Sequence, residues 1–157
     1  MVTATGPGGS SANVRDRRAL LTHFIEEVWN RGEVDSAGRY IAPRYMVQHD
    51  PGDPWDGREL DLDGYKERVR LALAPCPDQR FDLLAVIADD VAAIVVATWQ
   101  WAGTHTGALS GFPPTGRALR MTGATVYSFD GDDRITGHWQ VVDRLGVFQQ
   151  LRRNAET

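Results

Sequence analysis

The fold is decided by a predicted hairpin: Ala118-Leu-Arg-Met-Thr-Gly-Ala-Thr-Val-Tyr-Ser-Phe129, the turn Asp130-Gly-Asp-Asp133, and Arg134-Ile-Thr-Gly-His-Trp-Gln-Val-Val142. Two arms rich in β-branched and aromatic residues around an Asp-Gly turn are typical of antiparallel strands. Alternate side chains of a strand point to opposite faces. One face therefore carries His138, Gln140 and Val142 on the second arm, and one face of the first arm carries Met121, Gly123, Thr125 and Tyr127. Alternation alone does not decide which face looks inward.

Segments on both sides of the hairpin extend this sheet. Strands are expected at 81–88 and 91–106, followed by a loop at 106–116, and residues 143–151 read as a final helix. Upstream, a helix capped by Ser11 or Asn13 is expected to reach Asn30, with Gly32 as its stop. Further helices are expected at 34–41 and 63–74, with a short extended segment at 45–49.

Helices followed by a run of antiparallel strands indicate an α+β domain. We expect a cone-shaped α+β barrel, in which the N-terminal helices close the concave side of a strongly curved antiparallel or mixed sheet. Such a cone either fills with side chains or leaves an internal hydrophobic cavity. Residues 1–12 are rich in Gly, Ser, Thr and Pro and are expected to be a flexible tail, which leaves 13–157 as a single domain.

Composition excludes several classes of protein. A net charge of -4 gives no basic surface, so no nucleic-acid partner is expected. No apolar run is long enough to cross a bilayer and the N-terminus has no apolar signal segment, so we expect a cytoplasmic protein without membrane contact. The single cysteine, Cys76, excludes an internal disulfide, and the four histidines lack the spacing of a ligand set, so no metal site is predicted.

Several residues are candidates for a site on the hairpin. Asp143 is either the N-cap of the last helix or a carboxylate at a pocket edge that exchanges protons. His105 is either a polar group at a pocket mouth or a structural histidine. The aromatic residues of this region either line a pocket for polycyclic ligands or simply pack in the core; they are Trp99, Trp101, Phe112 and Trp139.

The chain resembles the SnoaL-like polyketide cyclase family of the nuclear-transport-factor-2-like superfamily, from the first helix to the end. The resemblance rests on these segments: Glu27-Val-Trp-Asn-Arg-Gly32, Gly103-Thr-His-Thr-Gly107, Gly111-Phe-Pro-Pro-Thr-Gly116, Asp130-Gly with Ile135, and Trp139 with Asp143 and Gln150-Leu151. It implies an α+β barrel with a hydrophobic cavity, no cofactor, assembly into homodimers or homotetramers, and action on aromatic polyketides in antibiotic biosynthesis.

The resemblance also implies site residues. The family's cyclases close a ring by aldol condensation, and their acid/base aspartate aligns with Gln140, a histidine with Tyr127 and a glutamine with Thr125. It places Trp29 at the cavity wall. The full set of expected catalytic residues is Gln140, His138, Tyr127, Asp143 and His105, and the expected substrate contacts are Trp29, Phe24, His49, Trp99, Trp101, Phe112, Met121, Thr125 and Trp139.

The glutamine at position 140 changes the expected chemistry, because an amide does not take up and return a proton as a carboxylate does. The preferred hypothesis is therefore a cofactor-free hydroxylase of anthracycline-type polyketides, a type of family member that usually works alongside a reductase. One alternative is an aldol cyclase whose acid/base work has moved to Asp143 or His138. Another is a non-catalytic ligand-binding module on the same fold.

Overall fold

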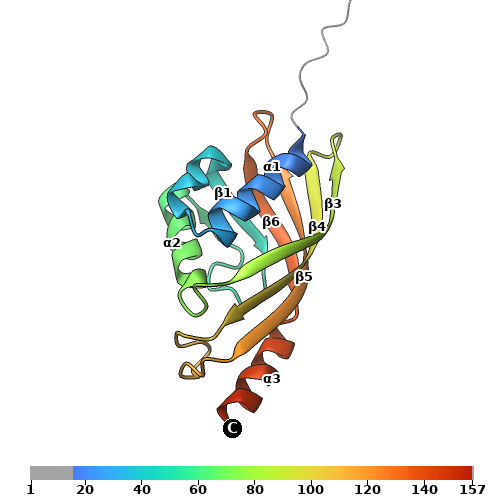
Figure 1. The fold of residues 1–157 in the computed structure, drawn as a ribbon. Helices are drawn as coiled ribbons and strands as arrows, with labels where there is room; N and C mark the ends of the chain where they lie inside the picture. Colours follow the sequence, from blue (N-terminus) through green and yellow to red (C-terminus); the bar gives the residue numbers. More distant parts are fainter. Residues whose placement is uncertain (1–15, 157) are drawn as a thin grey trace, which may run out of the picture.

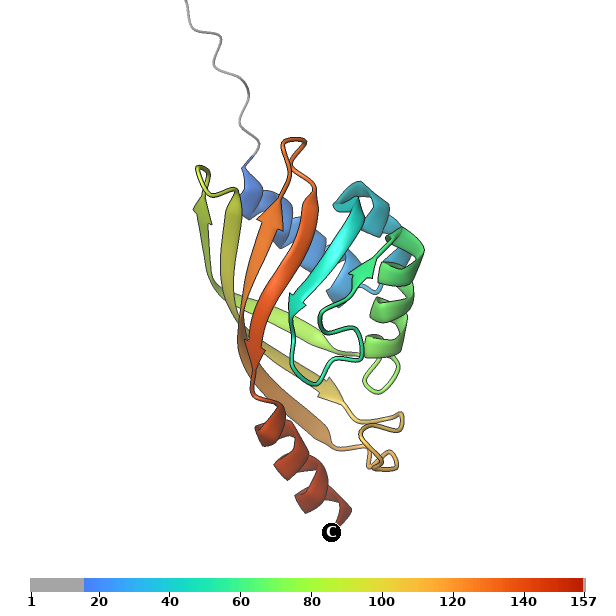
Figure 2. The same cartoon turned by 180° about the vertical axis from the view of Figure 1, so that it is seen from behind.

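The computed structural model describes residues 16–156, which form a curved sheet with helices on its concave side (Figures 1 and 2). The helical elements are α1 (Arg17–Phe24), the π-helical η1 (Ile25–Asn30), the 3₁₀-helical η2 (Val34–Arg39), α2 (Leu62–Leu73) and α3 (Arg144–Ala155). The strands are β1 (Ile41–His49), β2 (Glu59–Leu60), β3 (Arg80–Asp89), β4 (Ile94–Thr104), β5 (Ala118–Phe129) and β6 (Ile135–Val142).

The six strands form one sheet in the order β2-β1-β6-β5-β4-β3, with β2 and β3 as its edges. Among these six strands, the β1–β6 pair is parallel and the other pairs are antiparallel. α1 crosses the concave side of this open, curved sheet, and α3 projects beyond the lower end of the strands (Figure 1). The predicted α+β class with a mixed, curved sheet and N-terminal helices on its hollow side is confirmed.

The N-terminal helix differs from the expected one at both ends. Its cap is Asp16, whose carboxylate accepts hydrogen bonds from the backbone N–H groups of Arg18 and Ala19. The predicted caps Ser11 and Asn13, like the predicted tail 1–12, lie outside the described residues. Beyond Phe24 the helix widens into π-helical turns. There the Asn30 side chain donates to the Phe81 carbonyl and accepts from the Phe81 N–H, which ties this end of the helix to β3.

The decisive hairpin forms as predicted. β5 and β6 pair with Tyr127 opposite His138 and Thr125 opposite Gln140. Their shared face is the concave one, because His138 and Thr125 are buried while Trp139, the residue between His138 and Gln140, is 42% exposed. The face of the hairpin that carries His138, Gln140 and Thr125 is therefore the one that looks inward.

β1 contains an irregularity next to this hairpin. Val47 pairs with His138, but His49 pairs with Trp139. Between these two pairs β1 therefore contains one residue more than β6. Such a β-bulge interrupts the strict alternation of side chains. As a result His49 lies on the outer face, where its ring stacks on that of Trp139 at 4.9 Å, and the following residue, Asp50, is buried.

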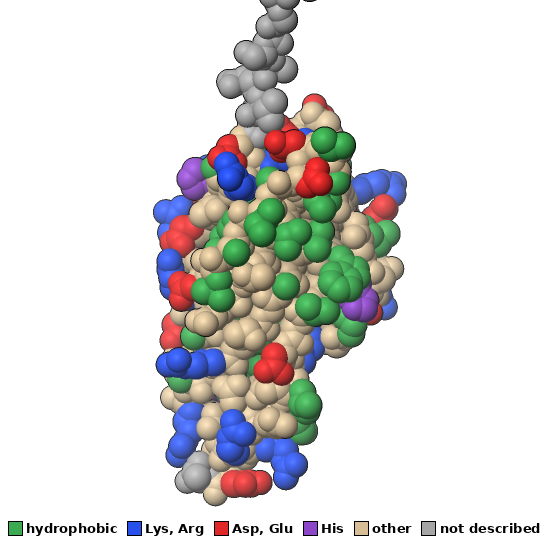
Figure 3. Space-filling view, turned by 90° about the vertical axis from the view of Figure 1, so that its right-hand side faces the viewer, with side chains coloured by type: hydrophobic (Ala, Val, Ile, Leu, Met, Phe, Trp, Pro, Cys, Tyr) green, Lys and Arg blue, Asp and Glu red, His purple; other side chains and the backbone are tan. Residues whose placement is uncertain are grey.

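Two groups of apolar side chains stabilise the concave side. The larger lies between α1 and the sheet and includes Leu21, Phe24, Val28, Val47, Val95 and Ala97. The smaller lies toward α3 and comprises Cys76, Trp99, Trp101, Leu119 and Leu151. The outer face of the sheet also carries exposed hydrophobic side chains, as Figure 3 shows. Within residues 16–156, no helix has the length and apolar character that a membrane span requires.

Candidate active site

A cavity of about 500 Å³ lies between the two groups of apolar side chains. Its walls come from the concave face of β3 to β6, from η1 and α2, from the loop after β1, and from the start of α3. A volume of this size is typical of sites for drug-sized organic ligands. The cavity is polar at one end and apolar along its length.

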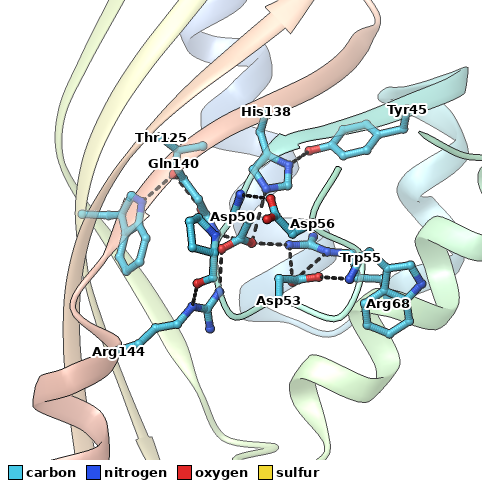
Figure 4. A network of polar contacts seen from close by, with 12 residues as sticks. Tyr45, Asp50, Asp53, Trp55, Asp56, Arg68, Thr125, His138, Gln140 and Arg144 are labelled. Atoms are coloured by element: carbon cyan, nitrogen blue, oxygen red, sulfur yellow. Dashed lines mark hydrogen bonds and ion pairs between the residues drawn. The ribbon is translucent and has the colours of Figure 1, made fainter. Parts of the chain in front are cut away.

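The polar end is organised around the carboxylate of Asp50, which is 1% exposed (Figure 4). Its Oδ2 accepts hydrogen bonds from Gln140 Nε2 at 2.6 Å and from an Arg68 guanidinium nitrogen at 3.0 Å, and His138 Nε2 lies 3.4 Å away. Its Oδ1 accepts from Arg144 at 2.5 Å. Four donors from three separate elements therefore converge on one buried carboxylate.

These contacts set the charge of Asp50. Burial alone raises the pKa of a carboxyl group. In Asp50 the hydrogen bond to His138 and the positive charges of Arg144 and Arg68 outweigh burial and hold the pKa well below its usual range. Asp53 forms a second ion pair with Arg68 at 2.9 Å. The polar end thus holds two carboxylates and two guanidinium groups, whose charges balance.

His138 connects Asp50 to a tyrosine. Burial lowers the pKa of His138, and the hydrogen bond to Asp50 offsets this shift only in part, so the imidazole is neutral at pH 7. Its Nε2 faces the carboxylate of Asp50, and its Nδ1 lies 2.6 Å from the Tyr45 hydroxyl. A carboxylate only accepts hydrogen bonds, so the network assigns the ring proton to Nε2. Nδ1 then accepts the proton of the tyrosine.

A second chain of hydrogen bonds leads from Gln140 to the apolar wall. Thr125 Oγ1 donates to Gln140 Oε1 at 3.0 Å and accepts from Trp99 Nε1 at 2.9 Å. The Gln140 amide is thus oriented, with its NH₂ group on Asp50 and its oxygen on Thr125. The other side of the wall is fixed by Gln79, which donates to the Trp29 carbonyl at 2.8 Å and accepts from the Trp101 indole.

Aromatic rings form the length of the cavity. Phe81 contacts Trp99 edge to face at 5.0 Å and Trp29 at 5.8 Å between ring centroids. Gly123 lies opposite Trp99 on β5, and a Cβ atom there would clash with the indole ring. The glycine therefore leaves room for the indole to lie along the wall. Flat apolar surfaces of this kind suit the rings of polycyclic ligands.

The structure brings together about half of the predicted site residues. The cavity lining includes Gln140, His138, Tyr127, Trp29, Trp99, Trp101 and Met121. Thr125 lies directly behind this lining, where it is buried and bonded to Gln140.

The other predicted site residues lie outside the cavity lining. Phe24, the last residue of α1, is fully buried in the core, and His49 and Trp139 stack on the outer face of the sheet. Phe112 packs edge to face on Phe148, at 5.6 Å between ring centroids. None of these four side chains contributes to the cavity wall among the residues that the structure describes.

Asp143 and His105, for which a catalytic and a structural role were both open, have structural contacts. Asp143 is the N-cap of α3, because its Oδ1 accepts from the Gly146 N–H at 2.9 Å. His105 is fully buried at the end of β4, where its Nδ1 lies 3.2 Å from the Thr115 hydroxyl. Neither side chain lies in the cavity lining described for residues 16–156.

Sequence reasoning missed the centre of the site. Asp50 directly follows the predicted extended segment 45–49, and no pattern in the sequence assigns a role to it or to Tyr45, Arg68 and Arg144. The available signal was an arginine, Arg68, in the helix whose buried positions Tyr65 and Val69 face the sheet. A buried arginine requires an acidic partner. That partner is separated from it by 18 positions along the chain.

Comparisons with known proteins agree with this architecture. The family model described as SnoaL-like polyketide cyclase matches residues 19–151. A search of curated proteins finds no match. Among solved structures, a proposed polyketide cyclase from Acidithiobacillus ferrooxidans is 52% identical, with a TM-score of 0.84 over 92% of this chain and 100% of that one.

Two more distant structures share the fold. AclR, a proposed hydroxylase from Streptomyces galilaeus, is 19% identical, with a TM-score of 0.73 over 88% of this chain and 85% of that one. IdmH, a proposed polyketide cyclase from Streptomyces antibioticus, is 24% identical, with a TM-score of 0.72 over 88% of this chain and 99% of that one. Taken with the family match and the 52% identical structure, the chain belongs to the SnoaL-like polyketide cyclase family.

Proposed function

We propose that the protein is a cofactor-free cyclase that closes a ring of an aromatic polyketide by intramolecular aldol condensation. The observation that supports this most is the buried Asp50–His138 pair at the polar end of an aromatic-lined cavity. Aldol closure requires removal of a proton next to a carbonyl group and return of a proton to the oxygen of the acceptor carbonyl. A neutral imidazole backed by a carboxylate is suited to such transfers.

This proposal replaces the preference for hydroxylation that the sequence suggested. That preference rested on Gln140, because no carboxylate was expected where sister enzymes hold their aspartate. Support for the cyclase proposal comes from Asp50, the residue after β1, whose carboxylate lies only 2.6 Å from Gln140 Nε2. Chemistry that depends on a negative charge beside the last hairpin is therefore available to this chain.

The cavity also suggests the form of the substrate. Its length is lined by Trp29, Phe81, Trp99 and Trp101, which suits fused flat rings. Since the charges at the polar end balance, we expect the substrate to place neutral groups there, such as ketones or a methyl ester, rather than a free carboxylate. The site of action, in this proposal, is the cytoplasm of a cell that makes aromatic polyketide antibiotics.

The test is incubation of the protein with an aromatic polyketide methyl ester whose last ring is open, followed by mass spectrometry. Ring closure gives a product of unchanged mass, or one lighter by a water molecule after dehydration. The matched control is the same ring system without the enolisable hydrogen, which should not react. Binding detected as a rise in melting temperature, without any product, would identify the non-catalytic module instead.

Hydroxylation is the second candidate, and a specific observation favours it. The two arginines hold the pKa of Asp50 far below neutrality, and a carboxylate of low pKa is a weak base. In this alternative the cavity binds an electron-rich hydroquinone, Gln140 and Tyr127 orient it by hydrogen bonds, and a partner reductase supplies the reduced ring. A product heavier by one oxygen atom, formed only with dioxygen and a reductase, would support hydroxylation over ring closure.

A further inference from the structure

We propose that Tyr45 is the residue that exchanges protons with the substrate, and that His138 and Asp50 act on the substrate through it. This inference rests on the proposed ring closure and adds the group that touches the reacting carbon. The three side chains come from β1, from β6 and from the residue after β1, and Figure 4 shows His138 between the other two, in contact with both. All three contribute to the cavity lining.

Asp50 is poorly suited to take a proton from a substrate. Its Oδ2 is surrounded by three donors, Gln140, Arg68 and His138, and its Oδ1 accepts a hydrogen bond from Arg144. The histidine and the two arginines favour the ionised carboxylate and lower its pKa, which makes it a weak base. The carboxylate therefore stabilises a positive charge on His138 and does not itself bind the proton of the substrate.

Both ring nitrogens of His138 have partners. Its Nε2 faces Asp50 and its Nδ1 faces the Tyr45 hydroxyl, and the side chain is 3% exposed. The only lone pair of the imidazole, on Nδ1, is directed at the tyrosine. A proton therefore reaches the histidine from the cavity by way of the Tyr45 oxygen.

Tyr45 has the geometry that the other two lack. Its oxygen donates one hydrogen bond, to His138, and as a phenol oxygen it also has lone pairs with which to accept. Its ring is held edge to face against Tyr65, at 4.6 Å between centroids, and its side chain is 1% exposed. The hydroxyl is thus fixed in direction, and Tyr45 contributes to the cavity lining.

The proton balance of the step is complete. The bond between the α-carbon of the substrate and its hydrogen breaks as that hydrogen binds the Tyr45 oxygen, and the original Tyr45 proton passes to Nδ1 of His138. The electron pair of the broken bond becomes the enolate, and Asp50 stabilises the imidazolium. After the enolate carbon attacks the acceptor carbonyl, the proton returns through Tyr45 to the new alkoxide. Tyr45 never carries a charge, which agrees with its burial.

The first test is the Tyr45→Phe variant, which removes one oxygen atom. We expect kcat for ring closure to fall about 100-fold or more, the usual contribution of a positioned acid/base group. The binding constant, measured by quenching of tryptophan fluorescence, should change less than about threefold, because the phenyl ring remains in place. The matched control is Tyr40→Phe, which removes a hydroxyl bonded to Glu27 outside the cavity lining and should retain turnover.

Exchange of the substrate's α-hydrogen in D₂O, followed by NMR, separates this inference from the proposed function. If the wild-type protein neither exchanges nor cyclises the substrate, the proposed function is rejected. If the wild type does both and Tyr45→Phe retains its rate within about fivefold, the role of Tyr45 is rejected and ring closure stands. A relay also predicts that Tyr45→Phe with His138→Gln loses little more than either change alone.

A measurement on the unaltered protein covers the case in which the variants do not fold. Nitrogen NMR of the imidazole should show the His138 proton on Nε2, with Nδ1 as an acceptor. Removal of the Tyr45 hydroxyl is not needed for this experiment. A proton on Nδ1 would overturn the relay, because Tyr45 would then be the acceptor of that bond and unable to pass its proton on.

Discussion

Single residues at the polar end depend on partners far away in the sequence. Asp50 meets Gln140 and Arg144 across 90 and 94 positions, and it meets Arg68 across 18. The Arg68 side chain is 7% exposed, so its charge needs the carboxylate; Arg144, at 41%, is partly hydrated. Asp50 therefore contributes both to the stability of the fold and to the proposed proton transfer.

We expect Asp50→Asn to destabilise the protein by roughly 3 kcal/mol, as for other buried ion pairs that lose one partner. The loss of stability is limited because the Arg144 guanidinium, once unpaired, is still hydrated by water. Urea denaturation of the variant measures this change. The control is Asp35→Asn, since the Asp35 carboxylate is 86% exposed and pairs with Lys66 at the surface. A loss for Asp50→Asn no larger than that of the control would contradict the role of the buried pair.

Stability should also depend on pH through His138, whose pKa is lowered by burial. Below about pH 6.5 the unfolded chain binds a proton at this histidine that the folded protein does not. The stabilisation is therefore present above pH 6.5 and is lost as the pH falls, by at most about 1.4 kcal/mol per pH unit. Asp50, whose pKa is also lowered, adds its own loss only below about pH 4. The free energy of unfolding, measured by urea denaturation between pH 7.5 and 5, should depend less on pH in His138→Gln than in the wild type.

At this scale the sequence revealed only half of the site. Alternation along β6 correctly grouped His138 with Gln140, because both lie within one regular strand. It gave no indication of Asp50, whose inward position depends on an irregular strand and on two distant arginines. Patterns of period two describe regular strands, whereas a charge cluster is assembled by the tertiary fold.

The element that links the cavity to the end of the chain is α3. Its first residue, Arg144, reaches back to Asp50 and donates to the Pro51 carbonyl at 2.8 Å, while Leu151 is buried in the second group of apolar side chains. Gly52, with φ of +93°, lies against the Arg144 side chain, and a Cβ there would clash with it. The helix is thus joined to the loop after β1 by a close contact.

The N-cap of α3 gives a prediction that separates structure from chemistry. Asp143→Ala should cost about 1 kcal/mol of stability, the usual value for a lost cap, and leave kcat unchanged. Asp143→Asn should be nearly neutral in both, because asparagine caps equally well. Thermal denaturation and the ring-closure assay measure the two effects. Loss of turnover in Asp143→Asn, with the fold intact, would instead assign acid/base work to Asp143.

The elements themselves were largely predictable. The expected strand at 118–129 matches β5, and the expected helix at 63–74 matches α2 within one residue. The sequence did not reveal the widening of the first helix into π-helical turns. That change follows from Asn30, whose side chain pairs with the backbone of Phe81 in a strand 51 positions away.

At the scale of the whole molecule, the outer face of the sheet is unusually apolar. Ile87, Val96, Val126 and Trp139 are cross-strand neighbours in successive pairs and form one row across four strands, and His49 stacks on its end. Ile87 is 64% and Trp139 42% exposed. Soluble monomers rarely expose a large continuous apolar surface. We propose that this row binds the same row of a second copy, as part of the expected homodimer or homotetramer.

Light scattering during gel filtration tests this assembly. The wild type should have twice the mass of the 17.4 kDa chain, and Ile87→Lys should reduce it to that of the monomer. The matched control is Val91→Lys, because Val91 is 99% exposed in the turn between β3 and β4, away from the row. A monomeric wild type, or a dimer unaffected by Ile87→Lys, would reject this interface.

The bulge in β1 means that the reactivity of the cavity depends on the backbone path of a strand as well as on its composition. If β1 kept all its residues but lost the bulge, strict alternation would turn the imidazole of His49 toward the ligand and expose the Asp50 carboxylate to water. Loss of Gln48 would have the opposite result, because a regular strand would then carry Val47 inward, His49 outward and Asp50 inward. A one-residue deletion that removes the bulge therefore preserves the acid in the cavity, whereas a straightened strand of unchanged length would replace it with an imidazole.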